Sequence, residues 1–76
     1  MGGGNIMART DFEIIRGLMV KDNTLDSWIF EKEATEKRDL TVEEENAYIQ
    51  ETVDQCYQII QDLSCSLVEA YRELME

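Results

Sequence analysis

The side chains in this chain that could carry chemistry are carboxylates and two thiols, because the 76 residues include no histidine. Histidine is the commonest general base and the usual partner of a nucleophilic serine or cysteine. Its absence also excludes a Cys/His zinc site and the Glu-x-x-His motif of diiron proteins. The glycines at 2–4 are followed by no Lys-Ser/Thr pair, so they form no phosphate-binding loop. We therefore expect no catalytic residues and no cofactor.

One short segment resembles the beginning of a calcium-binding loop. Residues 22–26 read Asp-Asn-Thr-Leu-Asp, which spaces oxygen ligands in the manner of an EF-hand. The loop needs a glycine at its sharp turn and a distal glutamate, and no glycine follows position 17. We expect no metal site here.

The two cysteines, Cys56 and Cys65, lie nine residues apart in a segment whose pattern predicts one helix. Nine helical residues span roughly 13 Å, whereas a disulfide needs Cα atoms within about 7 Å. An intramolecular disulfide is therefore not expected, and two free thiols suit a reducing compartment. Cys56 is interpreted as a small core residue, with an intermolecular disulfide across a parallel dimer as the alternative.

Helix-start signals determine the expected elements. Thr10 with Glu13 and Thr41 with Glu44 each form a capping box, and the chain contains no proline. With Thr24 as a third cap, the pattern predicts helices over about 11–20, 25–38 and 42–75. They form a single helical domain over 10–76, preceded by a flexible leader over 1–9.

Apolar residues repeat at heptad spacing along the third predicted helix. One set comprises Asn46, Val53, Ile60, Leu67 and Leu74, and the other comprises Ile49, Cys56, Leu63 and Ala70. A helix of 34 residues is roughly 50 Å long, and the two shorter helices cannot cover all of it. The sequence therefore predicts an all-α fold in which two short helices pack on one long amphipathic helix, completed by a helical homodimer. Its dimer and core seam would consist of Ile49, Val53, Cys56, Ile60, Leu63, Leu67 and Leu74.

Trp28, Ile29 and Phe30 cannot all face one side of a helix. The simplest interpretation makes Trp28 a core anchor between the second and third helices. The alternative is a binding hot spot, since tryptophan is enriched at the centres of interfaces. Phe30 is expected to be partly exposed or at the dimer interface.

Acidic residues dominate the surface chemistry. The chain carries 17 acids and 7 bases, for a net charge of −10. Direct binding to nucleic acid or to an anionic membrane needs clusters of Lys and Arg, so neither is expected. The carboxylates off the seam form the candidate partner-binding face: Glu43, Glu44, Glu51, Asp54, Asp62, Glu69 and Glu73. This face either keeps the protein soluble or imitates the charge of a nucleic-acid backbone.

Targeting signals are not evident in the sequence. It has no apolar run near 18 residues, and its start lacks the charged and apolar regions of a signal peptide. Position 6 is Ile rather than Ser or Thr, so the myristoylation pattern fails. We expect a cytoplasmic protein.

In charge, length and helicity, the chain resembles small acidic proteins of bacteriophages and mobile elements that disable host nucleic-acid-binding proteins. The resemblance covers no motif. It implies an inhibitor in the host cytoplasm that occupies the basic surface of a nucleoid protein, a polymerase or a nuclease. The alternative function is a coiled-coil adaptor or assembly module that binds through its apolar heptad seam.

Overall fold

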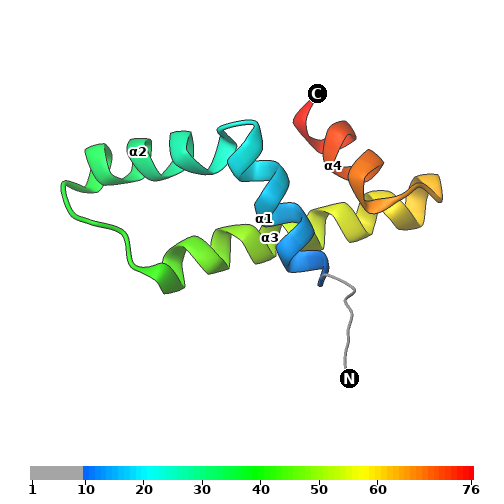
Figure 1. The fold of residues 1–76 in the computed structure, drawn as a ribbon, viewed down its shortest axis with the longest axis horizontal. Coiled ribbons are helices and arrows are strands. Elements are labelled where there is room, and N and C mark those ends of the chain that lie inside the picture. Colours follow the sequence, from blue (N-terminus) through cyan, green and yellow to red (C-terminus); the bar gives the residue numbers. More distant parts are fainter. Residues whose placement is uncertain (1–9) are drawn as a thin grey trace, which may run out of the picture.

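The computed structural model describes residues 10–76, and all of its regular elements are α-helices. They are α1 (Asp11–Lys21), α2 (Thr24–Glu36), α3 (Val42–Leu63) and α4 (Leu67–Met75), as Figure 1 shows. The all-α prediction is confirmed. The predicted leader over 1–9 lies outside the described residues.

Two of the predicted helix starts form as complete capping boxes. The Thr10 hydroxyl accepts a hydrogen bond from the Glu13 amide, and the Glu13 carboxylate accepts one from the Thr10 amide. Thr41 and Glu44 make the same pair of bonds at the start of α3. Each box satisfies two amides that a helix start would leave without partners.

The second helix differs from the expected 25–38 at both ends. Its N-cap is Asn23, in a left-handed conformation with φ 68°, and Thr24 is the first helical residue rather than the cap. At the other end Lys37 adopts φ 56° and terminates the helix. Glu33 accepts a hydrogen bond from the Leu40 amide at 3.0 Å in the connection to α3.

The predicted single helix over 42–75 is wrong, because the chain breaks at residues 64–66 into α3 and α4. Ser64 adopts the left-handed conformation (φ 53°). The Ser66 hydroxyl then accepts a hydrogen bond from the Glu69 amide and caps the start of α4. Serine competes well with helical hydrogen bonding, so this segment supports a break without glycine or proline. The turn lets α4 fold back over α3, as Figure 1 shows. Ala70 and Tyr71 are thereby buried, whereas a straight helix would leave that part of the seam uncovered.

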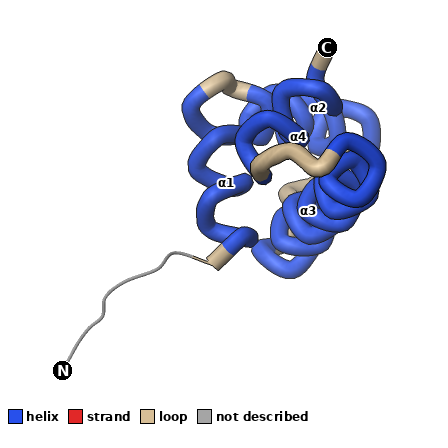
Figure 2. The backbone as a smooth tube through the Cα atoms, turned by 90° about the vertical axis from the view of Figure 1, so that its right-hand side faces the viewer, coloured by secondary structure: helices blue, strands red, loops and turns tan. Residues whose placement is uncertain are grey.

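The core lies where α1 and α4 pack against α3, as the view along α3 in Figure 2 shows. Its buried apolar members come from all four helices: Ile15, Met19, Leu25, Ile49, Val53, Cys56, Ala70 and Tyr71. Among residues 10–76 the one polar residue buried with them is Thr52, whose hydroxyl donates to the Tyr48 carbonyl at 3.1 Å. α2 is attached through its first half, by the buried Leu25 and by the Trp28 ring, which stacks on Tyr48 with ring centroids 4.1 Å apart.

Trp28 therefore joins α2 to α3, in agreement with its interpretation as an anchor between the second and third helices. Phe30, two positions further along α2, is 74% exposed, as the sequence indicated. Among residues 10–76, no helix combines the length and the apolar character that a membrane crossing requires.

Candidate partner-binding surface

The side of α3 that faces away from the core carries a mostly polar surface. The helix contains six acids and no base. Its buried residues Ile49, Val53 and Cys56 define the inner side, whereas Glu43, Glu51, Asp54 and Asp62 are exposed on the outer side. The four glutamines of the chain, at positions 50, 55, 58 and 61, are exposed on the same helix. We call Glu43, Glu51, Asp54 and Asp62 the α3 acidic face.

Opposite charges compensate few of the carboxylates. Within residues 10–76 the ion pairs are Lys32–Glu36, Arg38–Glu36 and Arg38–Glu44. None of them involves the α3 acidic face. The nearest polar partner there is the Gln50 amide, which donates to Asp54 at 3.1 Å. The face therefore presents four full negative charges to solvent.

Glu44, one of the predicted binding residues, has a structural position instead. Arg38 donates to both of its carboxylate oxygens, at 2.8 and 2.5 Å, and Glu44 also caps α3. The bonds from Arg38 and Thr41 lower the pKa of Glu44 to about 2, and the same pairing raises the pKa of Arg38. Its negative charge is therefore neutralised by Arg38 of the same chain, so Glu44 is not included in the α3 acidic face.

The acids beyond α3 do not extend the acidic face as a straight rod. In the continuous helix predicted over 42–75, the acids of residues 62–76 would extend the acidic face of α3. The turn at 64–66 instead puts Glu69 and Glu73 on the returning helix α4 and Glu76 at its C-cap. Glu69 accepts a hydrogen bond from Ser66 at 3.1 Å and belongs to the α4 cap. Glu73 lies with Arg72 and Cys65 along an open depression at the α3–α4 connection. The predicted acidic residues therefore form two separate groups, one on each helix.

The predicted seam is mostly used within the chain. Ile49, Val53 and Cys56 are buried, and Ile60, Leu67 and Leu74 are partly buried against the same core. Leu63 is 57% exposed. Asn46, expected at a core-type position of a dimer, is exposed. The folding back of α4 explains this outcome, because α1 and α4 cover the stripe that a second chain was expected to cover.

Both cysteines are free thiols, Cys56 buried and Cys65 partly buried. Burial raises the pKa of the Cys56 thiol, with a further contribution from Cys65, so Cys56 is a poor nucleophile. Cys65 lies in the connection rather than in α3, so the 13 Å helical separation assumed from the sequence does not apply. In residues 10–76 no group of three or more Cys, Asp or Glu side chains is arranged to hold a metal ion.

Two tyrosine–aspartate hydrogen bonds hold α1 in place, and the sequence did not indicate either. The Tyr57 hydroxyl donates to Asp11 at 2.5 Å at the start of α1, and the Tyr71 hydroxyl donates to Asp22 at 2.7 Å at its end. Each pair is more than 45 residues apart in the chain. No local spacing signals such a contact.

No protein-family model, no curated protein and no solved structure matches this chain.

Proposed function

We propose that this protein is a non-catalytic inhibitor whose α3 acidic face occupies the nucleic-acid-binding surface of a basic protein. Two observations carry the proposal: α3 contains no base, and within residues 10–76 Glu43, Glu51, Asp54 and Asp62 form no ion pair. The partner would be a nucleoid protein, a polymerase or a nuclease.

The physical basis is long-range attraction between opposite charges. Glu43 and Asp62 are 19 residues apart on one helix, which places them roughly 28 Å from each other along its axis. A one-signed surface of this length steers a basic partner toward it and accelerates association. Because exposed charges are screened by salt, the complex should weaken as ionic strength rises.

The test is displacement of fluorescent DNA from purified nucleoid, polymerase and nuclease proteins, at low and high salt. Glu51→Lys combined with Asp54→Lys should weaken displacement at least about tenfold, since charge pairs in close contact contribute more than about 1.4 kcal/mol. The matched control is Asp39→Lys with Glu76→Lys, which changes net charge equally away from α3. Glu44 is left intact because its side chain caps α3, and Glu69 because its carboxylate accepts a hydrogen bond from Ser66, the N-cap of α4.

The proposal fails if the α3 variant displaces DNA as well as the control does. It also fails if none of the purified proteins releases DNA at low salt. Circular dichroism of both variants verifies that the helices persist.

The second candidate is the adaptor that binds through apolar residues, and the exposure of Leu63 beside the partly buried Ile60 favours it. A partner using the rest of the seam would have to displace α1 or α4 from Ile49, Val53 and Cys56. Binding that resists high salt and is lost in Leu63→Ala would support this function over the inhibitor.

We propose further that the protein acts as a homodimer in the cytoplasm, where a reducing environment suits its free thiols. Because the heptad seam is occupied within the chain, the dimer requires a different surface.

A further inference from the structure

A groove lies between the end of α1 and the outer side of α4. It has a volume of about 330 Å³ and is lined by Leu18, Lys21, Asp22, Val68, Tyr71 and Arg72. Leu18, Val68 and the Tyr71 ring supply its apolar part, and the Tyr71–Asp22 hydrogen bond ties its two sides together. Sites for small ligands span ~300–1,000 Å³, so this groove accommodates one aromatic side chain.

Two cations border the groove. Lys21 and Arg72 are exposed, and neither forms an ion pair within the described part of the chain. The Asp22 carboxylate, which accepts the Tyr71 hydrogen bond, lies in the same lining, so the groove carries two bases and one acid. In a protein of net charge −10, this small positive excess distinguishes the groove from the acidic surface of α3. The chemistry that fits is an apolar side chain flanked by carboxylates.

The outer side of α2 presents that chemistry. Phe30 is the most exposed large apolar residue described, at 74%, and it lines a shallow depression with Asp26 and Glu31. Asp26 lies one helical turn before Phe30, and Glu31 follows it directly. Neither carboxylate is in an ion pair among residues 10–76.

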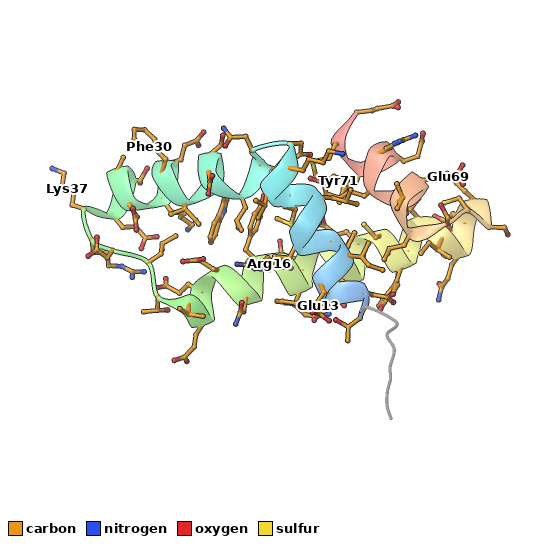
Figure 3. All side chains as sticks on the ribbon, in the orientation of Figure 1. Glu13, Arg16, Phe30, Lys37, Glu69 and Tyr71 are labelled. Atoms are coloured by element: carbon orange, nitrogen blue, oxygen red, sulfur yellow. The ribbon has the colours of Figure 1, made fainter. Side chains whose placement is uncertain are left out.

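Phe30 cannot enter the groove of its own chain. It projects from the middle of the continuous helix α2, on the side away from α3 (Figure 3), while the groove is lined by residues of α1 and α4 and by Asp22. A dimer that uses both patches would place Phe30 of each copy in the groove of the other. An isologous contact of this kind uses the same two patches twice and closes on itself.

We infer that the homodimer is formed by reciprocal insertion of Phe30 into the α1–α4 groove of a second copy, with Asp26 and Glu31 facing Lys21 and Arg72. The contact leaves the α3 acidic face uncovered, because that face points away from the core that α1 and α4 cover. The inference rests on the homodimer alone and not on the acidic face.

The first measurement is sedimentation equilibrium of the wild-type protein and Phe30→Ala. The wild type should associate reversibly to dimers. Phe30→Ala should raise the dimer Kd at least about 30-fold, the change expected for a central aromatic hot spot. The matched control is Val42→Ala, because Val42 is 70% exposed but belongs to neither patch. A wild type that stays monomeric, or a Phe30→Ala variant that dimerises like the control, overturns the inference.

The second measurement uses a charge exchange between two variants. One carries Asp26→Lys and Glu31→Lys, so its patch and its groove are both positive. The other carries Lys21→Glu and Arg72→Glu, so both are negative. Each variant alone should be monomeric, whereas an equimolar mixture should form heterodimers in which both contacts are complementary.

Circular dichroism verifies that both charge variants retain their helices, so that the mixture is interpretable. A mixture of folded variants that stays monomeric overturns the inference and assigns the groove to some other acidic ligand. Variants that each dimerise alone overturn it as well. In either case Glu51 and Asp54 are untouched, so the inhibitor proposal is tested separately.

Discussion

Tyr71 in α4 donates a hydrogen bond to Asp22 at the end of α1, across 49 residues of sequence and a distance of 2.7 Å. The Tyr71 oxygen also lies 3.3 Å from the Thr24 hydroxyl at the start of α2. A single buried phenol thus connects three helices at the α1–α2 turn. Tyr71 and Asp22 also line the α1–α4 groove, so the hydrogen bond that holds α4 against α1 also shapes the proposed dimer surface.

Tyr71→Phe removes the hydroxyl and keeps the ring. We expect it to lower the free energy of unfolding by about 1.5–3 kcal/mol, since the lost bond has a charged acceptor and the tyrosine is 4% exposed. Urea unfolding followed by circular dichroism measures this loss. Tyr57→Phe is the matched control: it removes the similar bond to Asp11, but Tyr57 is 40% exposed, so its loss should be smaller. Equal losses of unfolding free energy in the two variants would contradict the prediction that burial makes the Tyr71 hydrogen bond more stabilising than that of Tyr57.

Stability should fall in alkaline solution because of the same phenol. Burial, reinforced by the Asp22 carboxylate, raises the pKa of Tyr71 from 10.0 to about 12. A pKa raised by folding means that the folded state holds the proton more tightly. The contribution of the protonated Tyr71 to the stability of the folded protein is therefore complete below pH 10 and is lost as pH rises from 10 toward 12.

Urea unfolding at a series of pH values measures this dependence. Tyr71→Phe should reduce the alkaline loss without abolishing it, because the pKa values of Tyr48 and Tyr57 are also raised. An alkaline profile identical to that of the wild type would contradict the assignment to Tyr71.

Ser64→Gly discriminates between a broken and a continuous helix. Ser64 has φ 53° and ψ 39°, a left-handed conformation that costs a residue with a Cβ about 1–2 kcal/mol and that glycine adopts freely. The variant should therefore be more stable by about 1 kcal/mol, as measured by urea unfolding. In a continuous helix over 42–75, the same substitution would destabilise the protein by about 1 kcal/mol. The sign of the change decides between the two.

Two apolar residues of the predicted seam should respond differently to truncation. Ile49→Ala should lower the free energy of unfolding by about 2–5 kcal/mol, because Ile49 is 1% exposed in the core. Leu63→Ala should change it by no more than about 0.5 kcal/mol, since Leu63 is 57% exposed. The two unfolding curves should be recorded at low protein concentration, where association contributes little. A large loss from Leu63→Ala in the monomer would contradict its exposed position.

Helical content, the first turns of α1 and α3 and the core residues that α3 contributes could be predicted from the sequence. These features depend on residues three or four positions apart, as in the Thr10–Glu13 and Thr41–Glu44 capping boxes. The spacing of Ile49, Val53 and Cys56 correctly indicated a buried stripe. The exposure of Phe30 also followed from local geometry, because adjacent helical residues point in different directions.

The path of the chain after residue 63 was decided by tertiary structure. Heptad spacing continues through Ser64, Cys65 and Ser66 without interruption, so periodicity alone predicts one straight helix. A turn there forces Ser64 into the less favourable left-handed conformation, but it buries Ala70 and Tyr71. The free energy gained by that burial depends on contacts with residues of α1 as well as α3. The same fold-back divides the predicted partner-binding carboxylates between α3 and α4 and brings Lys21 near Arg72. Local sequence determined which segments are helical and which side of each is apolar. Only packing between distant segments decided which apolar stripes are covered within the chain, because the free energy of burial depends on contacts that no short spacing records.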